Sequence, residues 1–145
     1  MITINPYLNF NGNCEEAFAF YKSVFGGDFS YLSRFKEMPP NPDYPLPDAL
    51  REKIMHMSLP FSKETSLMGS DSTREFGGEA QFGNNVSLMV SAENKKEVDA
   101  IWAKLSEGAT ITMPLMDAFW GDYFGGLVDK FGVNWMLICP SDKPE

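Results

Sequence analysis

The sequence is poor in three features that often direct a protein's function: histidine, cysteine and positive charge. It has one histidine and two cysteines, and its 12 basic residues against 20 acidic ones give a net charge of −8. A nucleic-acid binder needs a basic stripe for the phosphate backbone, and we find none, so we expect no nucleic-acid partner. Cys14 and Cys139 form no metal-type or redox-type cluster, so we interpret both as reduced, buried residues of a cytosolic protein.

Long apolar runs are also missing. No apolar run approaches the ~20 residues that span a bilayer, and the N-terminal MITINPYLNF lacks the basic and apolar regions of an export signal. We therefore expect a soluble, cytoplasmic protein with no membrane partner. What is present is a hydrophobic fraction of 43% and an aromatic fraction of 14%, which is typical of a folded globular protein.

An internal repeat organises the chain. Residues 13–27 and 94–108 carry apolar residues at helical spacing and end in glycine, which predicts two helices that correspond at an offset of 81 residues. Each begins with an asparagine three residues before a glutamate, the capping-box pattern of a helix start: Asn13 with Glu16, and Asn94 with Glu97.

A predicted strand precedes each helix, and three more follow it. The expected strands are residues 5–10 and 85–90 before the helices, and 28–35, 53–61, 65–70, 109–116, 123–129 and 133–139 after them. The predicted fold class is therefore α+β, with two tandem βαβββ modules at about residues 1–75 and 82–140. The segment MPPNPDYPLP, residues 38–47, has five prolines, so we expect a long surface loop there.

The ordered stretches PYLNFNGNCEEAFAFYKSVFGG, KEMP, IMHMSLP, LMGSD and FWGDYFGGLVDKFGVNWM resemble the PhnB-like family of the vicinal oxygen chelate (glyoxalase/bleomycin resistance/dioxygenase) superfamily. The resemblance runs from Pro6 to Met136, nearly the whole chain. It implies one glyoxalase-like domain, residues 1–145, whose curved, mainly antiparallel sheets surround a cavity. It also implies a homodimer.

The resemblance bears on metal binding as well. Metal-dependent relatives place His, Gln or Glu side chains in the cavity, and the corresponding positions here are Asn5, Met68, Asn85 and Met136. A carboxamide oxygen is a weak neutral donor and a thioether suits soft copper. We therefore expect no zinc, iron or nickel site and no cofactor.

Strand alternation predicts which side chains line the cavity. The apolar face of each strand must meet the helices, so the polar face is expected to line the cavity. Trp120 and Asp122 precede the last hairpin, and two interpretations of them are open. They line the rim of the cavity, or they serve only in packing and turn capping. The predicted substrate-binding set is thus Tyr7, Asn9, His56, Met68, Ser70, Trp120 and Asp122.

The aromatic segment 119–136 divides into structural and candidate functional residues. We expect Asp129 to bind the backbone amides of a tight turn, and Trp135 to lie in the core beneath a helix. Tyr123 stands where many relatives resembling this chain carry arginine, which argues against recognition of an anionic substrate through that arginine.

Two classes of function remain open. One is a binding protein that holds a small molecule in the cavity without chemistry. The other is a lyase, isomerase or dioxygenase-type enzyme with His56 as general base or metal ligand, although a lone strand histidine also fits a structural role. Some members of the family carry a demethylubiquinone-methyltransferase description. We discount that activity, because the chain has no glycine-rich methyl-donor loop.

Overall fold

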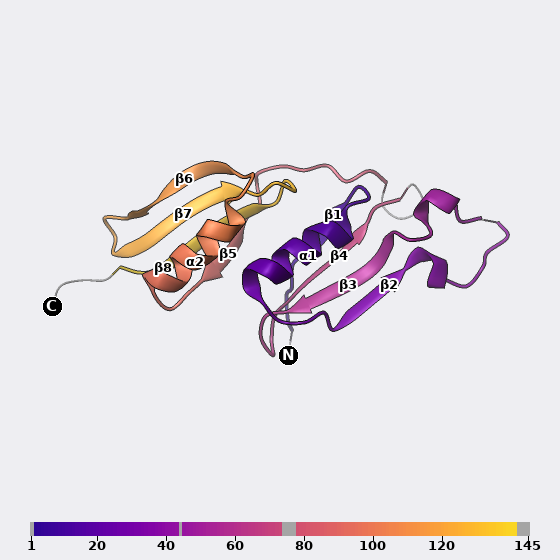
Figure 1. The fold of residues 1–145 in the computed structure, drawn as a ribbon, viewed down its shortest axis with the longest axis horizontal. Coiled ribbons are helices and arrows are strands. Elements are labelled where there is room, and N and C mark those ends of the chain that lie inside the picture. The colour runs from indigo at the N-terminus through magenta and orange to yellow at the C-terminus, as the bar shows by residue number, and fades with distance from the viewer. Residues whose placement is uncertain (1, 44, 74–77, 142–145) are drawn as a thin grey trace. The chain divides into compact units, whose positions relative to one another are not determined.

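The computed structural model describes residues 2–43, 45–73 and 78–141 of the chain (Figure 1). The first half contains β1 (Tyr7–Phe10), α1 (Cys14–Phe25), β2 (Tyr31–Arg34), β3 (Ile54–Pro60) and β4 (Ser66–Asp71). The second half contains β5 (Leu88–Ser91), α2 (Lys95–Leu105), β6 (Thr110–Asp117), β7 (Asp122–Val128) and β8 (Asn134–Pro140). The predicted order of one strand, one helix and three strands, twice, is confirmed.

The chain divides into two compact units, Met1–Gln81 and Phe82–Glu145. Each unit contains an open four-stranded sheet, in the order β1-β4-β3-β2 in the first unit and β5-β8-β7-β6 in the second. The first strand of each unit runs parallel to the last, and the other neighbours are antiparallel. The α+β class with mainly antiparallel sheets is therefore confirmed.

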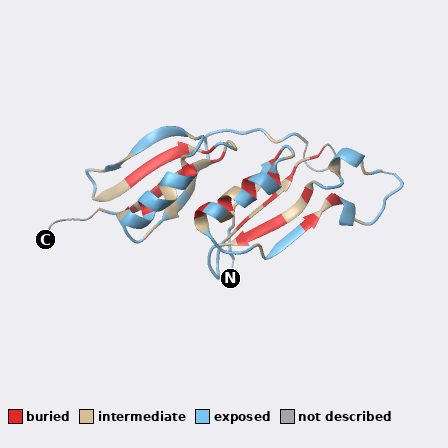
Figure 2. Cartoon of the chain, viewed as in Figure 1, coloured by how far each residue is buried: buried red, intermediate tan, exposed pale blue. Residues whose placement is uncertain are grey.

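One helix covers one face of each sheet, and the burial of the strands follows from this (Figures 1 and 2). In β8, Trp135, Leu137 and Cys139 are buried, while Asn134, Met136 and Ile138 on the other face are half-buried. β4 alternates in the same way, and its Gly69 lies so close to Phe18 of α1 that a Cβ there would stand 2.7 Å from the ring. The predicted core role of Trp135 is confirmed.

The two helices begin differently, although their sequences share the capping pattern. At α2 the prediction is confirmed, because the Asn94 side chain accepts a hydrogen bond from the backbone N–H of Glu97 at 2.9 Å. At α1 Asn13 is the N-cap residue as predicted, but its side chain makes no capping hydrogen bond. The buried carboxylate of Asp71, at the end of β4, accepts from the N–H groups at this helix start instead.

The start of the second unit corrects the predicted strand at residues 85–90. β5 begins at Leu88, and Asn85 lies outside it in an exposed turn. Tyr7 pairs with Met68 in the first sheet, and Met89 pairs with Met136 in the second. When the two units are aligned on these pairs, Met89 corresponds to Tyr7. Asn85 is therefore two residues from the position equivalent to Asn5.

The proline-rich segment 38–47 contains no α-helix or strand among its described residues, as predicted. It connects two single 3₁₀ turns, η1 (Phe35–Glu37) and η2 (Asp48–Leu50). Neither α1 nor α2, nor any other helix in the described ranges, is long and apolar enough to cross a membrane.

Candidate functional site

The face of the first sheet opposite α1 carries the predicted residues of the first unit. Tyr7 pairs with Met68 across β1 and β4, and Asn9 pairs with Ser70. Met57 of β3 pairs with Gly69 on the α1 side, so its neighbour His56 shares the opposite face with Ser70. Alternation therefore places Tyr7, Asn9, His56, Met68 and Ser70 on one sheet face, which we call the open face.

His56 lies at the centre of an aromatic cluster on this face. Its Nδ1 and the hydroxyl of Tyr7 are 3.1 Å apart in a hydrogen bond. The Tyr7 ring stacks on the imidazole with centroids 5.5 Å apart and planes at 23°, and the Tyr31 ring stands at the same distance with planes at 50°. Two tyrosines thus flank a half-buried imidazole and fix the orientation of its ring.

Tyr31 and Ser33 of β2 belong to the open face, although the sequence analysis did not assign them. Tyr31 pairs with Ser58, and Ser33 pairs with His56. Ser33 is 5% exposed, and within the described part of the chain its hydroxyl has no hydrogen-bond partner. A buried hydroxyl without a partner costs free energy, so Ser33 is a position on this face where hydrogen-bonding capacity is left unsatisfied. The alternation Tyr31–Ser33 was the signal that could have revealed both residues.

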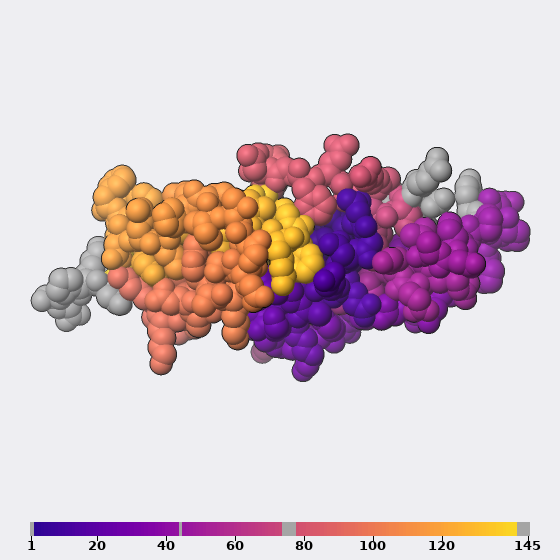
Figure 3. Space-filling model, turned by 45° about the horizontal axis from the view of Figure 1, so that its top comes forward, coloured from indigo at the N-terminus to yellow at the C-terminus, as the bar shows by residue number. Residues whose placement is uncertain are grey.

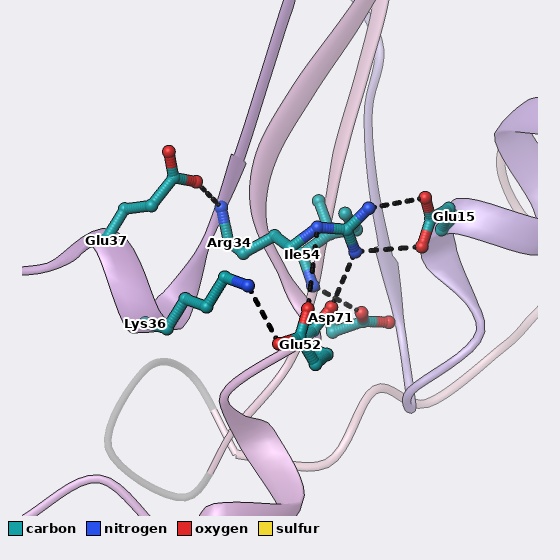
Figure 4. A network of polar contacts seen from close by, with 7 residues as sticks. All are labelled: Glu15, Arg34, Lys36, Glu37, Glu52, Ile54 and Asp71. Carbon is teal, nitrogen blue, oxygen red and sulfur yellow. Dashed lines mark hydrogen bonds and ion pairs between the residues drawn. The ribbon is translucent and has the colours of Figure 1, made fainter.

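A network of charged groups fixes the end of β2 (Figure 4). The Arg34 guanidinium donates two hydrogen bonds to the Glu15 carboxylate of α1, at 2.9 and 2.7 Å, and one to the Glu52 carbonyl at 2.7 Å. Glu52 also accepts from Lys36 at 2.8 Å. The hydrogen bond from Arg34 holds the pKa of Glu15 below its usual range, and that from Lys36 does the same for Glu52. This network therefore joins strand, helix and loop.

The second unit places Trp120 and Asp122 around the start of β7. The Trp120 ring is exposed and contacts Phe119 at 5.1 Å and Phe124 at 6.0 Å between centroids. Asp122 is half-buried at the first position of β7, and its backbone carbonyl accepts a hydrogen bond from Ala118. These contacts lie within the second unit, and the rim role of the two residues stays a prediction.

Tyr123 faces α2 and therefore lies on the covered side of its sheet. Its hydroxyl donates to Asp99 Oδ1 at 2.6 Å, and Lys95 Nζ stands 4.9 Å from the ring centroid. The hydrogen bond to Asp99 and partial burial raise the pKa of Tyr123 to about 12. Its side chain thus has a structural partner in α2.

The positions that the resemblance equates with metal ligands carry donors that suit zinc, iron and nickel poorly. The Asn5 side chain already accepts a hydrogen bond from the Ser66 backbone N–H at 2.9 Å, and Met68 and Met136 offer thioethers. Among the residues that the structure describes, no three His, Cys, Asp or Glu side chains converge as a metal site would require. This donor set lacks the imidazoles and carboxylates that hold such ions.

Comparison with known proteins gives the family of the chain. Residues 2–138 match the family model described as 3-demethylubiquinone-9 3-methyltransferase. Protein YjdN of Escherichia coli is 28% identical and is matched over 97% of each chain. The crystal structure of protein PA1353 from Pseudomonas aeruginosa is 34% identical, with a TM-score of 0.83 over 98% of this chain and 100% of that one.

Two further solved structures are similar to this chain. A PhnB protein from Bacillus cereus, described as a putative 3-demethylubiquinone-9 3-methyltransferase, is 29% identical with a TM-score of 0.75, over 95% of this chain and 99% of that one. A glyoxalase/bleomycin resistance protein from Albidiferax ferrireducens, 16% identical over 97% of each chain with a TM-score of 0.61, shares the fold. The chain therefore belongs to the PhnB-like family, whose model is described as 3-demethylubiquinone-9 3-methyltransferase and whose fold is that of the glyoxalase/bleomycin resistance proteins.

Proposed function

We propose that this protein binds a small molecule on the open face of the first sheet, at Tyr7, Asn9, His56, Met68 and Ser70. The observation that carries the proposal is the Tyr7–His56–Tyr31 cluster, in which two rings flank an oriented imidazole beside the unpartnered Ser33 hydroxyl. Aromatic walls with a few fixed polar groups are the usual composition of a ligand pocket.

The same residues indicate the kind of ligand. Tyrosine rings and Met68 favour an apolar or aromatic body, while the Ser33 and Ser70 hydroxyls and the Asn9 amide favour hydrogen-bonding groups. None of these side chains carries a formal charge. The ligand in this proposal is therefore a compact ring compound with hydrogen-bonding groups.

The direction of the Tyr7–His56 hydrogen bond decides whether His56 can only bind a ligand or can also act as a general base. If the Tyr7 hydroxyl donates to Nδ1, a neutral imidazole carries its proton on Nε2 and offers a hydrogen-bond donor there. If Nδ1–H donates to the tyrosine oxygen, Nε2 has a free lone pair and acts as a base. We propose the first arrangement, in which His56 binds an acceptor atom of the ligand and abstracts no proton.

The second arrangement supports the alternative function, a lyase, isomerase or dioxygenase-type enzyme with His56 as base. Methyl transfer is not part of either proposal. The β1–α1 connection is Asn11-Gly12-Asn13 and the β5–α2 connection is Ala92-Glu93-Asn94, so neither is the glycine-rich loop of a typical methyl-donor site.

The single histidine makes a direct experiment possible. Long-range ¹H–¹⁵N correlation spectra of untagged protein assign the imidazole tautomer to one residue, and we expect the proton on Nε2 at neutral pH. The same ring signals report the binding of ring-bearing fragments. We expect shifts that saturate in the wild type and in the control Ser62→Ala, and that weaken in Tyr31→Ala. A proton on Nδ1 favours the enzyme instead, and fragments that leave every ring signal unmoved contradict the site.

We propose further that the protein is a homodimer. Both sheets are open at their edges, and the second unit exposes Met89, Met116 and Trp120. Open edges and apolar patches of this kind are normally covered by association. Light scattering at micromolar concentration should give twice the chain mass of 16.3 kDa, and a monomer would rule the dimer out.

A further inference from the structure

The first unit contains a hollow of about 760 Å³ that is separate from the open face. Its lining comes from the stretches 35–42 and 45–51 and from Thr73, which lies beyond the end of β4. None of Tyr7, Asn9 or His56 lines it. This volume is within the range of about 300–1,000 Å³ that small-molecule pockets occupy.

The wall of this hollow is rigid and apolar. All five prolines of the loop line it: Pro39, Pro40, Pro42, Pro45 and Pro47. A proline has a fixed φ, so such a loop loses little conformational entropy when it holds one shape around a ligand. Phe35, Met38, Leu46 and Leu50 complete the apolar wall. The segment that carries the prolines lies at the surface of its unit, drawn in purple (Figure 3).

Charge distinguishes this hollow from the rest of the molecule. Its lining contains two cations, Lys36 and Arg51, and no carboxylate, although the chain has 20 acidic residues against 12 basic ones. Lys36 pairs with Glu52, which does not line the hollow. Arg51 is exposed, and its charge acts on the neighbouring Glu52 carboxylate, but the described residues give it no close ion pair. A guanidinium at the edge of an apolar hollow is suited to an anionic group.

We propose that this hollow is a second binding site, for a small organic anion with an apolar body. The apolar body lies among the prolines and Leu46, and the anionic group accepts hydrogen bonds from Arg51. The network of Figure 4 supports the site, because Arg34 and Lys36 both hold Glu52, the residue that follows Arg51. The backbone at Arg51 is thereby fixed to β2 and to α1.

Two fluorescent probes with related apolar bodies test the site. 8-Anilinonaphthalene-1-sulfonate is an apolar anion, and N-phenyl-1-naphthylamine lacks the sulfonate. We expect saturable binding of both to the folded wild type. Arg51→Gln should weaken the anion about fivefold, as for a partly exposed charge pair, and leave the neutral probe unchanged. Raising the salt concentration should weaken the anion in the wild type and have little effect in Arg51→Gln.

Three further variants locate the binding. Lys63→Gln removes one exposed positive charge from the turn between β3 and β4 and should change neither probe. Leu46→Trp fills the hollow and should weaken both probes, and His56→Ala should change neither. Equal losses in Arg51→Gln and Lys63→Gln, unchanged binding in Leu46→Trp, or no saturable binding would each overturn the proposal. His56→Ala separates this site from the open face, so the two proposals fail independently.

Discussion

The carboxylate of Asp71, the last residue of β4, accepts a hydrogen bond from the backbone N–H of Cys14, the first residue of α1, at 2.9 Å. The same oxygen accepts from Gly12 N–H at 3.0 Å, and the other oxygen accepts from Ile54 N–H at 2.9 Å. Asp71 is 3% exposed, so one buried carboxylate joins the start of α1 to the start of β3. Its negative charge also stabilises α1, because it lies at the positive, N-terminal end of the helix dipole.

Replacement of Asp71 should therefore be among the most damaging changes in the first unit. Asp71→Ala leaves buried N–H groups without acceptors, and we expect it to lower the free energy of unfolding by at least about 3 kcal/mol. Asp28→Ala removes a carboxylate from an exposed pair with Lys22 and should cost less than about 0.5 kcal/mol. Urea denaturation followed by circular dichroism measures both, and similar losses would show that Asp71 is not a structural anchor.

The role of Asp71 also shows what could be predicted from the sequence and what could not. Periodicity and local caps act within a few residues, so the helices, the alternation in β8 and the cap at Asn94 were predictable. At Asn13 the same local motif was displaced by an acceptor 58 positions further along the chain. Sequence spacing does not reveal such a partner until the fold brings it near.

The candidate site shows a similar division. Alternation placed Tyr7, Asn9, His56, Met68 and Ser70 on one sheet face, because each strand must turn its apolar side to the helix. The contact between Tyr7 and His56 depends on strand order, in which β4 lies between β1 and β3. The burial of Ser33 depends on the packing around β2. Neither property is encoded in the period of one strand.

Trp135 and His56 should differ strongly in their effect on stability. Trp135 is 2% exposed and donates its indole N–H to Asp129 Oδ2 at 2.8 Å, while the other Asp129 oxygen accepts from the N–H groups of Phe131 and Val133, as predicted for the turn. Trp135→Ala should cost about 3–5 kcal/mol. Trp135→Phe keeps most of the volume and isolates the loss of the N–H donor, at about 1–3 kcal/mol.

His56→Ala should cost less than either tryptophan variant, because the imidazole is half-buried on the open face. Its loss removes one hydrogen bond and leaves the Tyr7 hydroxyl, which is exposed, accessible to water. Chemical denaturation of the three variants under one set of conditions gives the comparison. If His56→Ala is as unstable as Trp135→Ala, the imidazole belongs to the core and its place in the binding site has to be withdrawn.

Tyr123 should titrate later than a free tyrosine. The hydrogen bond to Asp99 and partial burial raise its pKa to about 12, against an ordinary value of about 10. Because the folded state holds this proton more tightly, the stabilisation is fully present below pH 10 and is lost as pH rises from about 10 to about 12. Difference titration at 295 nm of wild type against Tyr123→Phe isolates the group. A tyrosinate signal from Tyr123 that is complete near pH 10 would contradict the contact with Asp99.

The last prediction concerns metal. We expect the purified protein to hold no stoichiometric zinc, nickel or iron, because Asn5, Met68 and Met136 offer one amide and two thioethers at positions that the resemblance equates with the ligands of metal-dependent relatives. The amide oxygen of Asn5 already accepts a hydrogen bond from the Ser66 backbone N–H. A metal ion that took this oxygen would leave the N–H without an acceptor. Elemental analysis after purification without chelator is the measurement, and His56→Ala is the control that removes the one imidazole in the chain. Metal well below one equivalent in both proteins is the expected result. One tightly held ion per wild-type chain that is lost in His56→Ala would instead establish His56 as a ligand and support the lyase or dioxygenase-type function.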